Sequence, residues 1–128
     1  MSIEPNREKM NQLIEALQKG TRPIDDEMIE EFISCTPNYE ITIKVVSQEG
    51  ICLGKHKVGD EWVMKGRGDY WQSPAGICMF AFSTIYPSLQ MLMYGGSFPW
   101  EPDSDAVLVP CPDSRNPVVF ELRRTGVV

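Results

Sequence analysis

The chain has a single histidine, His56, which lies four residues after a cysteine, Cys52. A thiol and an imidazole this close in sequence can share one site, with the imidazole as base and the thiolate as nucleophile or proton carrier. Lys55 and Lys57 flank the histidine and would attract an anion. A glycine-punctuated turn with a solvated basic tip explains the same residues without any function. A single histidine excludes every metal motif and proton relay that needs two.

Two further cysteines have neighbourhoods that suit chemistry. Cys78 falls in the first turns of a helix expected to begin at Pro74, and a helix start favours a thiolate. Cys111 stands between two prolines, which restrict the backbone on both sides and suit a side chain that must be aimed. The competing interpretation makes each cysteine a small buried hydrophobe. Cys35 has no comparable context.

These residues predict one shared pocket that contains His56 and at least two of the three cysteines. Asp60 or Asp113 would orient the imidazole, and Tyr86 or Trp100 would stack on a ligand at the pocket wall. The same set would also satisfy tetrahedral zinc. Its ligands would be Cys52, His56, Cys78 and Cys111. Zinc motifs ordinarily supply ligands in close pairs, which this sequence lacks, so the cofactor stays unknown.

Apolar periodicity predicts the helices of the chain. Residues 5–19 and 25–34 carry apolar stripes on a 3.6-residue period, which favours two amphipathic helices packed as a hairpin. The hairpin contacts expected from these stripes are Leu13, Leu17, Met28 and Phe32. A helical pair is expected over 74–94, with Ser73 as its cap and a bend near Pro87.

Alternating apolar and polar residues predict the strands. The first two strands are expected at 39–45 and 61–65, followed by a turn at 67–69. Two more are expected at 106–109 and 118–123, joined by a proline-rich turn.

This order of elements predicts an α+β fold. The expected sheet is small, mixed or antiparallel, and either open or partly closed into a barrel, with a buried helical pair and an N-terminal helical hairpin. Residues 1–38 contain eight acids and four bases, against ten and eight in residues 39–128. We therefore divide the chain into an acidic helical appendage, 1–38, and an α+β body, 39–128. The appendage is expected to pack on the body or across a homodimer.

Composition narrows the function. The chain is 42% hydrophobic and 23% charged, as globular proteins are, and its net charge is −6. An acidic chain lacks the basic face that nucleic-acid binding requires. No secretory signal is visible at the N-terminus, and polar residues interrupt the charge-free stretch from Tyr70 to Trp100. We expect a cytoplasmic protein that spans no membrane.

Several motifs together resemble a known pattern. They are the segment from Cys52 through His56 to Val58-Gly59-Asp60, then Gly76-Ile77-Cys78, Tyr86-Pro87, Tyr94-Gly95-Gly96, Pro99-Trp100, Cys111-Pro112-Asp113 and Asn116 to Phe120. From about Tyr39 to Arg124 the chain resembles a family of small, largely uncharacterised prokaryotic proteins. Lys55 departs from the tighter Gly-His form of that family. The resemblance implies no activity. It implies only that Cys52, His56, Cys78 and Cys111 belong to the shared pattern and that Cys35 does not.

Two function classes follow from the sequence. The first is a small cytoplasmic protein with a Cys/His-lined pocket, which either binds a small molecule or is a thiol- or metal-dependent enzyme. The second is a non-catalytic interaction or oligomerisation module whose cysteines are core residues. A thiol redox sensor is a third possibility, and it requires two cysteines within bonding distance.

Overall fold

The structure is a computed structural model, and it describes residues 3–66 and 74–128. The chain forms two compact units, one ending at Pro37 and one running from Asn38 to Val128. Each unit is described by itself. The turn expected at 67–69 and the helix cap expected at Ser73 lie outside the described residues.

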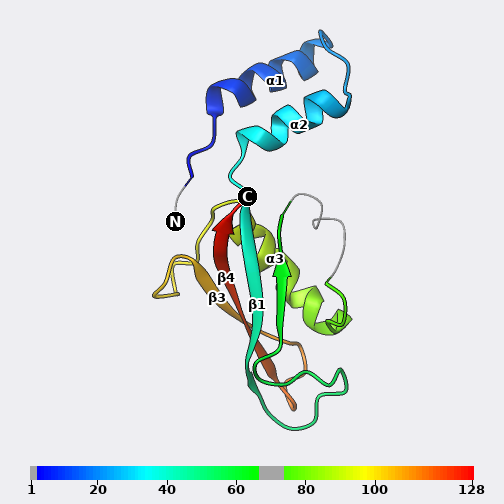
Figure 1. The fold of residues 1–128 in the computed structure, drawn as a ribbon, viewed down its shortest axis with the longest axis vertical. Helices are drawn as coiled ribbons and strands as arrows, with labels where there is room; N and C mark the ends of the chain where they lie inside the picture. Colours follow the sequence, from blue (N-terminus) through cyan, green and yellow to red (C-terminus); the bar gives the residue numbers. More distant parts are fainter. Residues whose placement is uncertain (1–2, 67–73) are drawn as a thin grey trace. The chain divides into compact units, whose positions relative to one another are not determined.

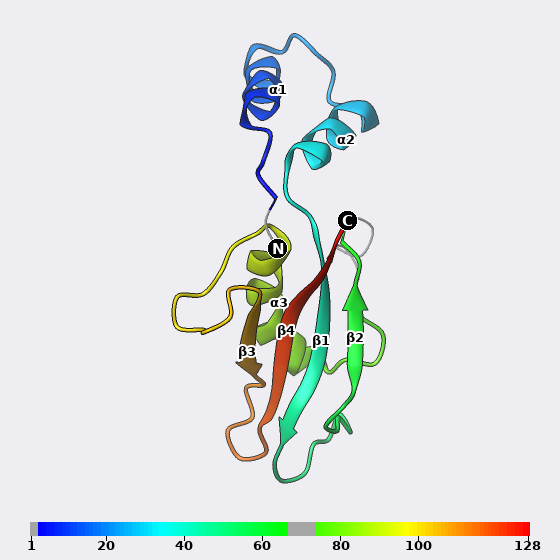
Figure 2. The same cartoon turned by 60° about the vertical axis from the view of Figure 1, so that its left-hand side comes forward.

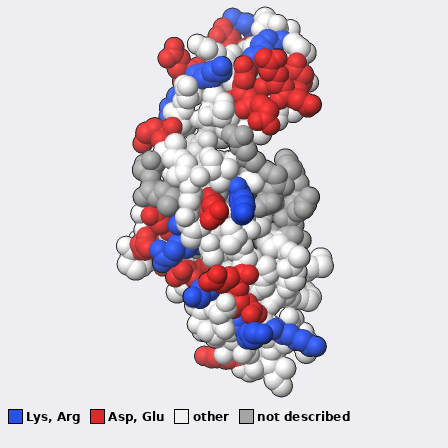
Figure 3. All heavy atoms as spheres, viewed as in Figure 1, with Lys and Arg blue, Asp and Glu red and all other residues white. Residues whose placement is uncertain are grey.

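The first unit contains two helices, α1 (Arg7–Lys19) and α2 (Asp26–Cys35), shown in Figure 1. Side-chain oxygens cap both helices, because the carboxamide of Asn6 and the carboxylate of Asp25 accept hydrogen bonds from first-turn N–H groups. Acidic side chains gather over α2 in Figure 3, which agrees with the predicted acidic character of this unit.

The hairpin core is smaller than the sequence predicts. Leu13, Met28 and Cys35 are buried, and Phe32 packs against them. Leu17, expected in the contact, is instead 38% exposed. Cys35 thus serves as a core residue of the helical unit, where a small apolar side chain fits between two helices.

The second unit contains a four-stranded antiparallel sheet. Its strands are β1 (Tyr39–Gln48), β2 (Glu61–Met64), β3 (Ala106–Pro110) and β4 (Val118–Val127). The spatial order is β2-β1-β4-β3, with every neighbouring pair antiparallel (Figure 2). Of the alternatives left open by the sequence, the sheet is therefore antiparallel, and it is not closed into a barrel.

The two faces of the sheet differ in chemistry, as the alternation predicts. The buried face carries Tyr39, Ile41, Ile43, Val45, Met64, Phe120 and Leu122. The opposite face is largely polar, with Val63 and Leu108 as exposed apolar side chains: Thr42 and Thr125 are hydrogen-bonded at 2.9 Å, and Lys44 pairs with Glu61 at 3.8 Å. Sheets with one solvated face show this pattern.

A single helix, α3 (Met79–Met93), covers the buried face of the sheet (Figures 1 and 2). Its buried side chains recur every three or four residues, which places them on one stripe. They are Ala81, Ile85, Leu89, Leu92 and Met93. Each large one stabilises the fold by about 1.5–3 kcal/mol relative to solvent exposure.

Helix α3 differs from the predicted helical pair in two ways. It begins at Met79 rather than Pro74, because Gly76 has a φ of 84° and no α-helix can run through that conformation. It also continues through Pro87, which is exposed, instead of dividing there. A proline inside a helix removes its own N–H donor and crowds the carbonyl four residues earlier, and the buried side chains on both sides of Pro87 hold the helix together against this cost.

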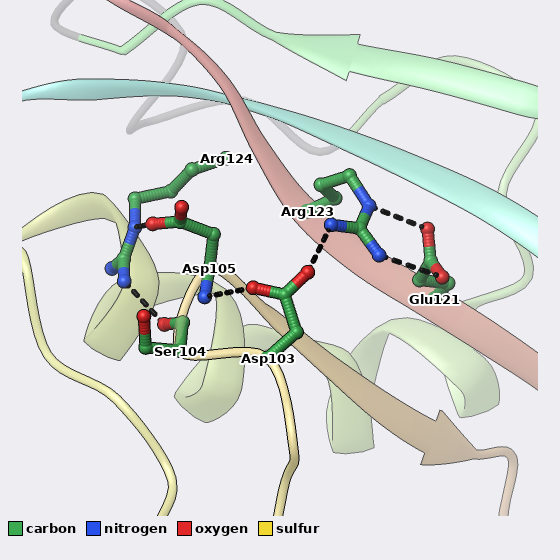
Figure 4. A network of polar contacts seen from close by, with 6 residues as sticks. All are labelled: Asp103, Ser104, Asp105, Glu121, Arg123 and Arg124. Carbon is green, nitrogen blue, oxygen red and sulfur yellow. Dashed lines mark hydrogen bonds and ion pairs between the residues drawn. The ribbon is translucent and has the colours of Figure 1, made fainter. Parts of the chain in front are cut away.

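Arg124 fixes the far end of α3, and Figure 4 shows its contacts with Ser104 and Asp105. Its guanidinium donates to the backbone carbonyls of Leu92, Gly96 and Ser104 and to the carboxylate of Asp105. It also lies over the ring of Tyr39, 5.2 Å from the centroid. Leu92 is in the last turn of α3, so this buried arginine satisfies helix-end carbonyls and ties them to β4.

None of the helices in the described part of the chain is both long and apolar enough to cross a lipid bilayer.

Candidate functional site

The candidate site lies at one end of the sheet. The last residue pair between β1 and β4 is Gln48 with Val118, so the β1–β2 and β3–β4 connections leave the sheet together. Helix α3 begins at this same end, where the hydroxyl of Thr84 donates to the carbonyl of Pro110. Three segments far apart in sequence therefore meet here.

These segments enclose a cavity of about 410 Å³. Its lining residues are Cys52, Leu53, Gly54, His56, Cys78, Phe80, Ala81, Cys111, Pro112, Asp113, Asn116 and Val118. All four residues that the sequence singled out for chemistry, three cysteines and the histidine, border this one space. The three cysteines are half-buried free thiols, whereas Cys35 is buried in the helical unit.

His56 is held rigidly in the cavity wall. Only 6% of the residue is exposed, and its ring stands edge-on to Trp62 and Phe120 at centroid distances of 5.2 and 5.9 Å. Its Nε2 accepts a hydrogen bond of 3.0 Å from the backbone N–H of Cys78. A neutral imidazole that accepts at Nε2 carries its proton on Nδ1. Nε2 is therefore already bonded to the backbone and is not placed as a base for a thiol.

Gly54 leaves part of the cavity wall without a side chain. A Cβ added to Gly54 would lie 3.2 Å from Cys78 Cβ, 3.5 Å from His56 Nε2 and 3.7 Å from Cys52 Sγ. Two cysteines and the histidine thus border the space that this missing side chain leaves. Any larger residue would fill it.

Cys111 is oriented by β4. Its N–H donates to the Val118 carbonyl at 2.8 Å, and its Sγ accepts from the Val118 N–H at 3.3 Å. The sulfur is thereby fixed at the cavity wall by β4. Cys78 is the N-cap residue of α3, and its side chain makes no capping hydrogen bond.

Asp113 organises its own loop instead of orienting the histidine. Its carboxylate accepts from the backbone N–H groups of Arg115 and Asn116 and from the Asn116 carboxamide, and these bonds lower the pKa of Asp113. The Asn116 carboxamide oxygen in turn accepts from the N–H of Ile51 at 2.9 Å. The two loops of the cavity are joined through this pair.

Three predicted pocket residues are placed elsewhere. Asp60 accepts from the N–H of Lys57 within the tight turn of the β1–β2 connection. Tyr86 lines a separate cavity of about 340 Å³ along α3. Trp100 is 71% exposed and packs against Phe98 at a centroid distance of 5.1 Å.

The rim of the cavity is apolar and exposed. Leu53 is 94% exposed and Phe80 is 76% exposed, although both line the cavity. The sequence analysis did not identify either residue, because an isolated apolar residue in a turn or first helical turn carries no signal of its own. Gly54 likewise has no signal in the sequence beyond its place in a turn, and only the distances to its neighbours show that it borders the cavity.

The four candidate zinc ligands are not grouped around one position. Within residues 3–66 and 74–128, no three His, Cys, Asp or Glu side chains are placed to hold a metal ion. The predicted zinc ligands therefore share a wall without converging on one point.

Comparisons with known proteins identify no family for this chain. No protein-family model matches it, and no match was found among curated proteins or among solved structures. The resemblance to small prokaryotic proteins therefore stays a prediction from sequence motifs.

Proposed function

We propose that this protein binds a small, largely apolar molecule in the cavity between the two sheet connections and α3. The observation that carries the proposal is the convergence of three separate segments on one cavity that contains Cys52, His56, Cys78 and Cys111. Its volume falls in the range of roughly 300–1,000 Å³ that small-molecule sites occupy.

The hydrogen bonds of the cavity support binding over acid–base catalysis. The His56 Nε2 atom accepts from a backbone N–H, and the Asp113 carboxylate and the Asn116 carboxamide bond within the loops. These groups hold the walls in place. A ligand would then contact mainly carbon and sulfur atoms, which favours an apolar molecule.

Thiol exposure distinguishes this proposal from the interaction-module alternative. A module whose cysteines are core residues would bury them, as the helical unit buries Cys35. The other three cysteines are half-buried around an opening instead. Four free cysteines also suit a reducing compartment such as the cytoplasm.

Titration with an uncharged apolar dye such as Nile red tests the proposal. We expect one saturable binding site for the dye. Gly54→Ala should bind the dye more weakly, because its methyl group would enter the cavity beside Cys78. Gly126→Ala is the matched control, since its Cβ would make an ordinary 3.5 Å contact with Glu40 on a different part of the sheet. Equal dye affinity of the two variants and the parent, or binding that does not saturate, would contradict the proposal.

A further inference from the structure

We propose, as a deepening of the proposed function and resting on it, that the ligand is an electrophile captured by a thiol. The chemical class that fits is a small apolar α,β-unsaturated carbonyl compound, and the nucleophile is Cys78. The inference combines three observations: the thiol cluster, the bonding of the polar neighbours and the position of Cys78 at the start of α3.

The cavity wall concentrates nucleophilic sulfur in apolar surroundings. Cys52, Cys78 and Cys111 all line it, and the other chemistry-bearing side chains are committed to hydrogen bonds that hold the loops. A cavity that served only to hold a hydrocarbon would need no sulfur, because aliphatic side chains fill such walls equally well.

Cys78 has the best placement among the three sulfurs. Cys111 Sγ already accepts a hydrogen bond from the Val118 N–H, and Cys52 belongs to the β1–β2 connection, which supplies no helix terminus. Cys78 is the N-cap residue of the 15-residue helix α3, and its side chain makes no capping bond. The amino end of a helix attracts negative charge, including the charge that grows on a carbonyl oxygen during thiol addition.

The reaction balances without any further reactant. A bond forms between Cys78 Sγ and the β-carbon of the ligand, and the carbon–carbon π bond breaks. Its electron pair moves toward the carbonyl and gives an enolate. The proton released from the thiol to water is replaced by a proton from water at the α-carbon, so the product is a neutral thioether.

The exposed rim agrees with an apolar electrophile. Leu53 and Phe80 stand at the mouth of the cavity with most of their surface exposed to water. An aromatic or aliphatic part of the ligand would cover them and gain about 25 cal/mol for each Å² of apolar surface removed from water.

The test uses 4-phenylbut-3-en-2-one as the probe and intact-mass spectrometry with peptide mapping as the readout. We expect one adduct, on Cys78, with a rate that saturates as probe concentration rises. Positioning in the cavity should make the rate at least about tenfold faster than for N-acetylcysteine. Acrylamide, a polar acceptor, should show no such advantage.

Two variants and one unreactive analogue complete the experiment. Cys78→Ser should lose the adduct, while Cys35→Ala, altered outside the cavity, should keep it. The saturated ketone 4-phenylbutan-2-one measures binding alone by displacement of Nile red. If the ketone binds but the enone adds no faster than to N-acetylcysteine, or adds elsewhere, the electrophile inference is overturned and the binding function stands. If neither compound enters the cavity, both proposals fail.

Discussion

At the scale of single residues, His56 joins the β1–β2 connection to the start of α3 and to the sheet. Its imidazole accepts the Cys78 N–H and packs edge-on against Trp62 and Phe120. The residue that sequence analysis assigned to chemistry therefore has a positioning role in this structure. Removing its ring would free the start of α3 and open space beside Phe120.

The His56→Ala variant measures this role. We expect its free energy of unfolding to fall by about 2–4 kcal/mol, because a buried ring and a buried hydrogen bond are both lost. Urea unfolding monitored by tryptophan fluorescence gives the value. Lys57→Ala, one residue away and exposed, is the control and should change little. A His56→Ala protein as stable as the control would show that the ring does not hold the cavity wall.

The pair of Asp105 and Arg124 predicts a pH dependence of stability. The Arg124 guanidinium hydrogen-bonds to Asp105 and lowers the pKa of that carboxyl in the folded state. Stability from a lowered carboxyl pKa is fully present above the unfolded value, near 4, and is lost as pH falls through the folded pKa. Acid should therefore weaken the fold at this contact.

Asp105→Asn tests that dependence. At neutral pH we expect a loss of about 2–3 kcal/mol, since Arg124 keeps its three carbonyl partners but loses its carboxylate. Between about pH 5 and 3, the free energy of unfolding should fall less steeply in the variant than in the parent. Asp103→Asn provides the comparison, because Asp103 bonds to the more exposed Arg123 in the same cluster (Figure 4) and should matter less. Parallel pH curves for Asp105→Asn and the parent would refute the assignment.

At the scale of elements, α3 contains a proline, Pro87, at an exposed position where no packing contact calls for proline. Pro87 is exposed, and an alanine there would restore the missing N–H donor to the helix backbone. We expect Pro87→Ala to raise the free energy of unfolding by about 1–2 kcal/mol, after allowing for the stiffer unfolded chain that proline gives. Thermal and urea unfolding would both report it. A destabilised variant would mean that the proline shapes α3 to fit the sheet.

The elements show which parts of the fold are visible in sequence. Alternation predicted the start of β1 at Tyr39 and of β4 at Val118, because a half-buried strand imposes its period directly on the residues. The start of α3 was missed, since Gly76 followed by Cys78 can continue a helix or break it, and only the observed φ decides. Arg124 was missed for a related reason: in the polar run at the end of β4, nothing marks it as buried.

The candidate site shows the same division. Cys52, His56, Cys78 and Cys111 were identified because rare side chains stand out in a sequence. Trp100 and Tyr86 were predicted at the pocket wall from their aromatic type and from the glycine-containing loop before Trp100, and neither lines the cavity that holds the cysteines. The path of the backbone decides which aromatic residues reach the cavity, and residue type does not determine that path.

At the scale of the whole molecule, the chain consists of two units with separate cores. Because each core is complete within its unit, we expect a chain that lacks residues 1–36 to fold and unfold cooperatively. Circular dichroism during heating checks the fold, and light scattering checks the mass of the particle. A truncated chain with no cooperative transition would show that the sheet depends on the helices.

The same truncation tests the predicted homo-oligomer. Ile24 and Ile29 of the helical unit are exposed apolar side chains, which suits a surface that meets another copy. We expect the shortened chain to differ from the full chain in oligomeric state or solubility. An unchanged mass with unchanged solubility would count against association through the helices.

The order of the strands affects how readily the sheet of one molecule pairs with the sheet of another at high concentration. The outermost strands, β2 and β3, have four and five residues, while the two central strands have ten each. β3 ends in Pro110, which has no N–H to offer a passing chain. Short edge strands of this kind leave few backbone N–H and C=O groups for a neighbouring sheet to pair with, which disfavours edge-to-edge association. The two ten-residue strands, β1 and β4, pair with each other in the middle of the sheet, so their backbone groups are not available to another chain.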